Sequence, residues 1–386
     1  MASRPKILCI SLTPIMGDAR VLRQIGVLAQ FGDVTTVGFG PAPALAADHV
    51  EVPATLKTLP QTISGVAALA LRMLNTSELN APAVRFAHEA LQGRKFDLVV
   101  SNDARVLALA HAIADGAPVW ADLHEWAPEE RSHILSWRLL VAPLMVHLCR
   151  KYLPRSAAVT TVCDSIAQLY KERFGVETQV MRNSGPWQNL SPTSVREETI
   201  RLVHSGAAVH GRSIETMIDV VRSLDDSYTL DLYLVPGGDG GKYLDSLKER
   251  ASDCDRIVFR APVAPAAIPL TLNEYDVGVF WIPPTHTNAR FALPNKFFDY
   301  VQARLAIAVG PSVEMASLVE HHGLGAVSAG FEVEQCRASL LSLDRDAIIQ
   351  SKRAADEASR ELSFETDERR AQSIIESLLS VRGARG

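Results

Sequence analysis

Short apolar segments alternate along the 386 residues of this chain with longer segments in which apolar residues recur at helical spacing. The apolar runs are mostly continuous, which is typical of strands buried on both faces of a parallel sheet. We therefore predict a series of strands and helices in the first half. The strands are expected at residues 6–12, 34–39, 97–101, 119–123, 158–162 and 179–182, and the helices at 20–31, 84–92, 106–114 and 166–174.

Residues 184–198 interrupt this pattern, because they are rich in Ser, Pro and Asn and show no sustained period. They are predicted to link two domains. A second series follows, with strands expected at 201–205, 229–235, 256–260, 277–281, 306–309 and 325–327, and helices at 214–224, 243–251, 295–304 and 313–321.

This order predicts an α/β protein with two doubly wound, Rossmann-like domains that face each other across a cleft. We expect the N-terminal domain at residues 1–184, the linker at 185–198 and the C-terminal domain at 199–366. The last helix, at 367–383, is expected to pack back on the N-terminal domain. Ligands of such sheets bind outside the carboxyl ends of the strands, so the cleft is the expected site.

Composition and charge narrow the range of partners. The chain is 47% hydrophobic with a net charge of −5, which gives no electrostatic reason to expect nucleic acid. Its five cysteines are scattered without metal-ligand spacing, as expected of small buried side chains in a reducing compartment. The first residues lack the apolar core of a signal peptide, and no apolar run reaches about 18 residues. We expect a cytoplasmic protein without a metal site.

Two loops of the first half carry candidate chemistry. In the first, residues 13–20, Gly17 would allow a ligand to approach the backbone, whereas Asp18 is expected to be a helix N-cap. In the second, His124 could hydrogen-bond a sugar hydroxyl, and Glu125 could accept a proton or orient His124. A pair of residues that only caps the loop remains the alternative for His124 and Glu125.

Two segments of the second half could hold an anion. Gly206 allows a tight turn after a strand, and Arg212 opens the next helix, where it could clamp a diphosphate. Asn295 and Lys296 lie at the start of another predicted helix, where backbone N–H groups favour anions, and Asp299 follows one turn later. An ordinary solvated helix start is the alternative for the second segment.

Residues 134–155 form an apolar, basic-edged helical pattern that Pro143 interrupts. The segment is too short and too charged to span a bilayer. It could lie on a membrane surface, or it could be buried in the first domain with its basic end extended to solvent.

Taken together, these segments resemble glycosyltransferase family 4, the retaining enzymes of the GT-B architecture. The resemblance extends over most of the chain and includes an Asp-x-His-Glu element at 122–125 and a Leu-Pro-Asn-Lys element at 293–296. The segments that carry it are residues 17–39, 96–130, 204–218, 292–304 and 363–379.

The resemblance implies a nucleotide-diphosphate sugar as donor substrate, without a cofactor. Asp299 would replace the family's glutamate on the ribose, Arg212 with Lys296 would neutralise the diphosphate, and His124 would contact the transferred sugar. Gly17 would approach the leaving phosphate or the acceptor, and Gly206 and Asn295 would join the donor site. The sequence departs from the family at Phe291, where a first glutamate is usual, and at Ser213, where a lysine usually follows the arginine.

We therefore expect a metal-independent, retaining transferase that moves a sugar to a glycan, lipid-linked or small-molecule acceptor. Polysaccharide biosynthesis and peripheral contact with the inner face of a membrane fit such an acceptor. Two alternatives remain: a sugar-nucleotide epimerase of the same fold, and an inactive nucleotide-sugar-binding subunit, an alternative that Phe291 keeps open. Neither the sugar and the base nor the acceptor can be deduced from the residues.

Overall fold

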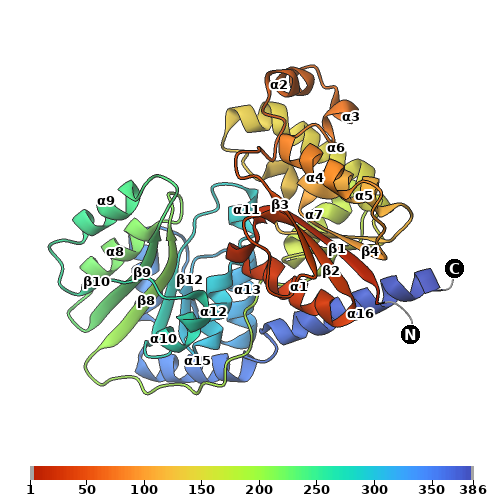
Figure 1. Cartoon of the computed structure of the whole chain (residues 1–386). Coiled ribbons are helices and arrows are strands. Elements are labelled where there is room, and N and C mark those ends of the chain that lie inside the picture. The colour runs from red at the N-terminus through yellow and green to blue at the C-terminus, as the bar shows by residue number, and fades with distance from the viewer. Residues whose placement is uncertain (1–3, 384–386) are drawn as a thin grey trace. The chain divides into compact units, whose positions relative to one another are not determined.

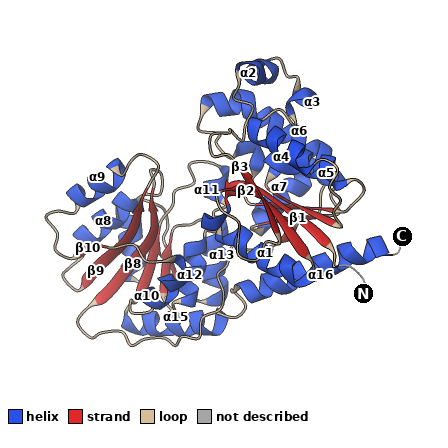
Figure 2. Ribbon diagram, viewed as in Figure 1, coloured by secondary structure: helices blue, strands red, loops and turns tan. Residues whose placement is uncertain are grey.

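The computed structural model describes residues 4–383, which form two compact units. The first unit contains Met1–Arg182 together with Asp367–Gly386, and the second contains Asn183–Thr366. Each unit is a parallel sheet covered by helices (Figures 1 and 2). The predicted pair of doubly wound, Rossmann-like domains is confirmed.

The first unit has a seven-stranded sheet in the order β3-β2-β1-β4-β5-β6-β7. Its strands are β1 (Lys6–Pro14), β2 (Asp33–Phe39), β3 (Asp48–Val52), β4 (Leu98–Asn102), β5 (Val119–Leu123), β6 (Ala158–Thr161) and β7 (Gln179–Val180). The helices are α1 (Ala19–Phe31), α2 (Ile63–Ala70), α3 (Leu74–Ser77), α4 (Pro82–Leu91), α5 (Leu107–Ala114), α6 (Ala142–Tyr152), α7 (Asp164–Phe174) and α16 (Phe364–Gly383).

The core of this unit explains why apolar runs predicted its strands. Leu8 and Ile10 of β1 and Val99 of β4 are fully buried in one cluster with residues of α4 and α5. Strand β3 was not predicted, because its sequence DHVEV alternates and only Val52 is buried. An edge strand with one solvated face lacks the continuous apolar run of an inner strand.

The second unit has a six-stranded sheet in the order β10-β9-β8-β11-β12-β13. Its strands are β8 (Ile200–Ala208), β9 (Tyr228–Pro236), β10 (Ile257–Arg260), β11 (Val277–Phe280), β12 (Ala306–Val309) and β13 (Gly325–Val327). The helices are α8 (Ile214–Ser223), α9 (Lys242–Arg250), α10 (Ile268–Leu272), α11 (Thr287–Arg290), α12 (Asn295–Gln302), α13 (Val313–His322), α14 (Val333–Leu341) and α15 (Arg345–Ala358).

A single glycine fixes how α12 lies on this sheet. A Cβ atom at Gly278 of β11 would lie 2.6 Å from the ring of Tyr300, so only glycine leaves room for that ring. Tyr300 is fully buried and donates its hydroxyl toward the carbonyl of Val279 at 3.3 Å. The first turn of α12, which contains Asn295 and Lys296, is thereby held beside β11.

The 134–155 segment divides into two parts. Residues Trp137–Val141 form a short π-helix, η4, and Pro143 lies in the first turn of α6, where its missing N–H is not needed. Leu144, Met145 and Leu148 of α6 are buried, as expected for the part inside the domain. Ile134, Leu135 and Leu139 are exposed.

Two findings concern membranes and metals. Within residues 4–383, no helix is both long enough and apolar enough to cross a membrane. In the same residues, no group of three His, Cys, Asp or Glu side chains is arranged to hold a metal ion. The cysteines are free thiols, and all except Cys254 are buried.

Candidate functional site

Each sheet reverses its strand order at one point, and such points form the binding crevice of doubly wound folds. In the first unit this point lies between β1 and β4, and in the second between β8 and β11. Polar and charged side chains gather at the carboxyl ends of both strand pairs. We describe the two units separately.

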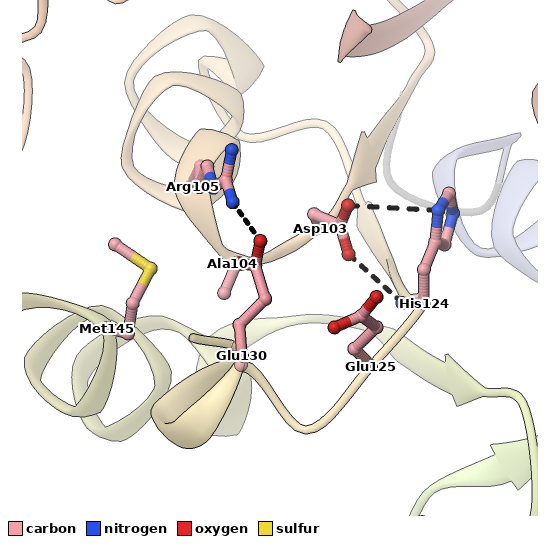
Figure 3. A pocket seen from close by; sticks show the side chains of 8 residues that line it. Asp103, Ala104, Arg105, His124, Glu125, Glu130 and Met145 are labelled. Atoms are coloured by element: carbon pink, nitrogen blue, oxygen red, sulfur yellow. Dashed lines mark hydrogen bonds and ion pairs between the residues drawn. The ribbon is translucent and has the colours of Figure 1, made fainter. Parts of the chain in front are cut away.

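In the first unit, a small pocket of about 130 Å³ opens beside β4 and β5 (Figure 3). It is lined by Asp103, Ala104, Arg105, His124, Glu125, Ala127, Glu130 and Met145. Arg105 forms an ion pair with Glu130 at one side of the pocket. The predicted residues His124 and Glu125 therefore both face a cavity.

The pKa of Glu125 is unusually high for a carboxyl group on a side chain that remains in contact with solvent. The protein surrounding the carboxyl limits its hydration, and the negative charges of Glu130 and Asp103 add to this effect, so the pKa of Glu125 rises to about 7. A carboxyl group of this pKa is suited to exchange protons near neutral pH.

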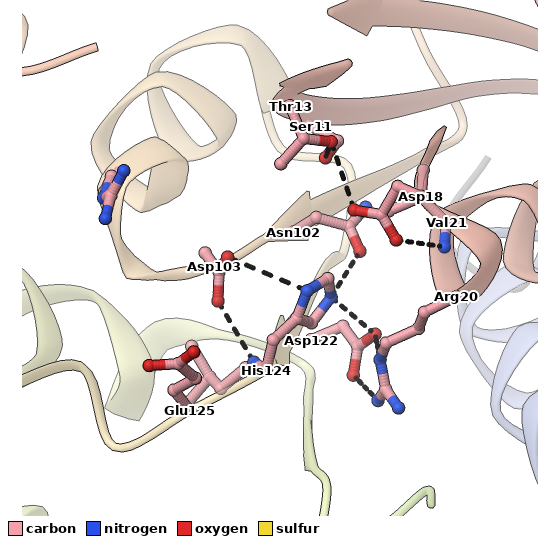
Figure 4. A network of polar contacts seen from close by, with 12 residues as sticks. Ser11, Thr13, Asp18, Arg20, Val21, Asn102, Asp103, Asp122, His124 and Glu125 are labelled. Carbon is pink, nitrogen blue, oxygen red and sulfur yellow. Dashed lines mark hydrogen bonds and ion pairs between the residues drawn. The ribbon is translucent and has the colours of Figure 1, made fainter. Parts of the chain in front are cut away.

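His124 lies at the centre of a polar network (Figure 4). Its Nε2 is 3.1 Å from Oδ1 of Asn102 and 3.4 Å from Oδ2 of Asp122, and its backbone N–H donates to Oδ1 of Asp103 at 3.1 Å. Burial lowers the pKa of His124, but the charges of Asp103 and Asp122 outweigh it, so the pKa is raised. The ring is thus held in one orientation with its positive form favoured.

Arg20 and Asp122 form a buried ion pair beneath His124. Arg20 donates to both carboxylate oxygens of Asp122, at 2.9 and 2.6 Å, and to the carbonyl of Met181 at 2.9 Å. Asp122 is only 1% exposed. Burial raises the pKa of Asp122, but the charges of Arg20 and His124 outweigh it and lower the pKa. The ion pair helps to hold His124 in place. Arg20 is therefore not an exposed residue on the surface of α1.

Two aspartates precede helices in this unit, Asp18 and Asp103. Asp18 is an N-cap, as predicted, because its Oδ1 accepts from the N–H of Val21 at 3.2 Å. Asp103 is not, since its side chain makes no capping hydrogen bond and instead accepts from His124. Its φ of 72° and ψ of 160° form a strained combination for a residue other than glycine. In this conformation Oδ2 of Asp103 lies 3.7 Å from Nδ1 of His124.

Gly17 lies in the turn between β1 and α1, at the end of a one-turn helix, Ile15–Gly17. A Cβ atom at Gly17 would meet nothing within 4 Å, so the first unit itself does not require a glycine there. A ligand at this turn remains a prediction.

In the second unit, two cations converge on one glycine at the β8 and β11 strand ends. Gly206 has a φ of +136°, and a Cβ atom there would lie 2.7 Å from Nζ of Lys296 and 3.9 Å from a terminal guanidinium nitrogen of Arg212. Only glycine allows this approach. Three residues that sequence singled out in separate segments are therefore brought together.

Lys296 is held by neutral groups. Its side chain is 6% exposed, its Nζ donates to Nε2 of His204 at 3.0 Å, and Nζ lies 4.5 Å from the ring centre of Phe280. Nδ1 of His204 is 2.8 Å from the carbonyl of Val279, which places the ring proton on Nδ1 and leaves Nε2 as acceptor. Burial and the charge of Arg212 lower the pKa of Lys296 far below its usual value, although Asp299 opposes them.

Arg212 adds a second positive charge that lacks a counter-ion. It is half-buried, and burial lowers the pKa of its guanidinium. Among the described residues, no carboxylate pairs with Arg212. A guanidinium without a paired carboxylate among the described residues, placed beside a buried lysine, favours binding of an anion.

The remaining predicted residues flank these cations on α12. Asn295 is exposed at the first position of the helix, and Pro294 precedes it without a side-chain cap, so no cap side chain accepts from the first N–H groups. Asp299 is half-buried, and its charge raises the pKa of Lys296. Phe291 lies before this helix, with the guanidinium of Arg290 5.2 Å from its ring centre.

Sequence reasoning missed His204, Phe280, Asn102 and the role of Asp122. A signal existed for Asp122, because Arg20 and Gln24 are polar residues one turn apart on the buried face of α1 and require a buried polar partner. No signal existed for His204, since its contact with Lys296 depends on the sheet order.

Comparisons with known proteins agree with this architecture. Residues 28–183 match the sequence model of Glycosyltransferase Family 4. A comparison with curated protein sequences found no match.

Three solved structures show the same fold over nearly the whole chain. HepE from Anabaena, in complex with UDP-glucose, is 17% identical with a TM-score of 0.67, covering 97% of this chain and 100% of that one. Sucrose-phosphate synthase from Thermosynechococcus elongatus is 12% identical with a TM-score of 0.70, covering 98% and 100%. WaaG, a glycosyltransferase of lipopolysaccharide biosynthesis, is 12% identical with a TM-score of 0.67, covering 96% and 99%.

The fold is therefore GT-B, as expected from the resemblance. The match of residues 28–183 to the family model, together with this fold, supports a glycosyltransferase.

Proposed function

We propose that this protein transfers a sugar from a nucleotide-diphosphate sugar to a glycan, lipid-linked or small-molecule acceptor, with retention and without a metal ion. One observation carries the proposal: Lys296 and Arg212 meet over Gly206 at the switch point of the second sheet, without a carboxylate to neutralise Arg212 among the described residues. A diphosphate would supply the negative counter-charge that Arg212 lacks. The UDP-glucose complex of the similar HepE structure supports a donor of this class.

The proposed donor site uses residues of one unit. Arg212, Lys296 and the N–H groups at Asn295 hold the diphosphate, Gly206 provides the room, and Asp299 accepts from the ribose hydroxyls. Lys296 here replaces the lysine that the family usually places after the arginine, where this chain has Ser213. Stabilising the negative charge that develops on the leaving diphosphate is the main catalytic contribution of such a site.

In the first unit, His124 is proposed to contact the transferred sugar, with Gly17 near the leaving phosphate or the acceptor. The acceptor hydroxyl attacks from the face that the diphosphate leaves, so that configuration is retained. The proton of this hydroxyl passes to the leaving phosphate or to Glu125, whose pKa of about 7 suits an acceptor of protons.

Donor binding is expected to be coupled to proton uptake. Burial and Arg212 keep the pKa of Lys296 low in the free protein, and a bound diphosphate raises it by adding negative charge. Binding of UDP should therefore take up protons, by up to about one per site, over the pH range in which Lys296 of the free protein titrates. Titration calorimetry in two buffers of different ionisation enthalpy measures this number, and the Lys296→Met variant is the control that should take up none. Equal uptake by both proteins would contradict the role of Lys296.

Transfer should depend on pH through Glu125. If its carboxylate accepts the proton, kcat of the wild type falls as the pH drops through about 7, because the carboxyl becomes protonated. The Glu125→Gln variant should be about 100-fold slower and lose this dependence, as typical of lost general-base catalysis. If Glu125→Gln kept the wild-type rate and the wild-type pH profile, the proton of the acceptor hydroxyl would pass to the leaving phosphate and not to Glu125.

Product analysis tests the proposed function as a whole. A transferase releases nucleoside diphosphate and forms a new glycoside only when an acceptor is present. An epimerase interconverts the donor sugar without acceptor. An inactive binding subunit, the alternative that Phe291 keeps open, binds the donor and leaves it intact.

A lipid-linked acceptor would bring the protein to the inner face of a membrane, and we propose polysaccharide biosynthesis as the setting. This choice of acceptor is supported by the apolar, basic 134–155 segment, of which Leu135 and Leu139 are exposed.

A further inference from the structure

Large apolar side chains are exposed together at one end of the first unit. They come from two segments that are distant in the sequence, the α2–α3 region and the turn leading into η4. Ile63 is 95% exposed, Leu71 72% and Leu135 59%. We call this surface the α2–η4 patch, and its members are Ile63, Val66, Leu71, Met73, Ile134, Leu135 and Leu139.

The two segments form one surface. Helices α2 and η4 are in contact, and the guanidinium of Arg72 donates to the carbonyl of Leu139 at 2.7 Å. Arg72 has a φ of 58°, an unfavourable left-handed conformation for this residue, and the bond to η4 helps to hold it. Helices α2 and α3 lie beyond α4 and α6 at the end of the unit (Figure 1). Exposed apolar side chains gathered on elements in contact mark an interaction site.

The two segments that form the patch carry charged side chains of one sign. Residues 61–77 and 131–163 contain no Asp or Glu, although the chain as a whole carries a net charge of −5. Arg72, Arg131 and Arg138 are exposed in these segments. Two carboxylates adjoin these segments in the sequence: Glu78 pairs with Lys151, and Glu130 pairs with Arg105 and with Arg131. Of the three exposed arginines, Arg72 and Arg138 therefore have no carboxylate pair among the described residues.

Apolar side chains that alternate with exposed arginines match the boundary of an anionic lipid layer. A second copy of this chain fits less well, because a two-fold symmetric contact would bring the arginines of both copies together without carboxylates. We propose that the α2–η4 patch docks the protein on membranes that contain anionic phospholipids. This inference extends the proposed function by assigning the membrane-binding surface, and its test requires no donor or acceptor.

Sedimentation of the full chain with vesicles tests the proposal. We expect binding to vesicles of phosphatidylcholine with phosphatidylglycerol, weakened by salt, and much weaker binding to phosphatidylcholine alone. The triple variant Ile63→Ser/Leu71→Ser/Leu135→Ser should bind at least about tenfold more weakly, since its inserted apolar area is lost. Arg138→Gln alone should weaken binding to the anionic vesicles about fivefold.

The control replaces exposed apolar residues of the second unit, Leu270 at 62% and Leu341 at 44% exposure. Leu270→Ser/Leu341→Ser should bind vesicles like the wild type. Equal binding of the wild type and the triple variant would overturn the proposal. So would a concentration-dependent dimer that the triple variant abolishes while vesicles bind neither protein, because the patch would then be an interface between copies.

Discussion

The Arg212→Ala variant is expected to bind UDP or its sugar conjugate roughly 100-fold more weakly than the wild type. Arg212 is half-buried beside Lys296, and the donor diphosphate is proposed to be its counter-ion. A charge-assisted, bidentate contact with phosphate contributes about 3 kcal/mol, which corresponds to this change in Kd. Titration calorimetry with the full chain gives Kd directly.

A matched control comes from α8, the helix that begins just after Arg212. Arg222 of α8 is partly exposed and pairs with Asp253 at the surface of the second unit. Arg222→Ala should change Kd less than twofold, since it removes a charge of the same kind away from Gly206. Near-equal Kd values for Arg212→Ala and the wild type would remove Arg212 from the donor site.

The Arg20→Met variant is expected to lose about 3–5 kcal/mol of the free energy of unfolding of the first unit. Asp122 is 1% exposed and receives two hydrogen bonds from Arg20, so the variant leaves its charge buried without that partner. Hydrogen exchange in denaturant, followed in peptides of β4 and β5, measures this unit separately from the other. Arg94→Met, which breaks the more exposed pair with Asp48, should cost below about 1 kcal/mol.

The loss of stability that Arg20→Met causes should become smaller as the pH falls. Burial alone raises the pKa of Asp122, but Arg20 and His124 lower it below its unfolded value. The resulting stability is present above the unfolded pKa, about 4, and is lost as the pH falls further. The difference in the free energy of unfolding between the variant and the wild type should therefore be smaller at pH 3 than at pH 6. A constant difference would mean that packing of the Arg20 side chain, and not its charge, stabilises the unit.

Much of the fold could be predicted because the inner strands of a parallel sheet consist of continuous runs of apolar residues. The bounds of β5 (Val119–Leu123) and β12 (Ala306–Val309) were predicted correctly for this reason. The edge strand β3 and the exposed helix α2 were not predicted, since the first alternates and the second exposes apolar residues such as Ile63. Neither shows the pattern of a buried element.

The candidate sites were predictable only as separate residue types. Gly206, Arg212 and Lys296 were chosen for their chemistry, but their convergence depends on the position of β8 beside β11 and on the room left by Gly206. The same applies to His124, whose partners Asn102 and Asp103 lie at the carboxyl end of the neighbouring strand β4. Sequence spacing contains no information on such contacts between strands.

The thermal stability of the full chain in the presence of a panel of nucleotide sugars is the most direct test of the donor site. At a ligand concentration of about 100 times Kd, a bound donor stabilises the native state by about 2.7 kcal/mol, which should raise the Tm by several degrees. We predict that one or a few nucleotide sugars raise the Tm of the wild type, and that the same compounds have little effect on Arg212→Ala. If every nucleotide sugar left the wild-type Tm unchanged at millimolar concentration, or shifted both proteins equally, the proposed donor site would be wrong.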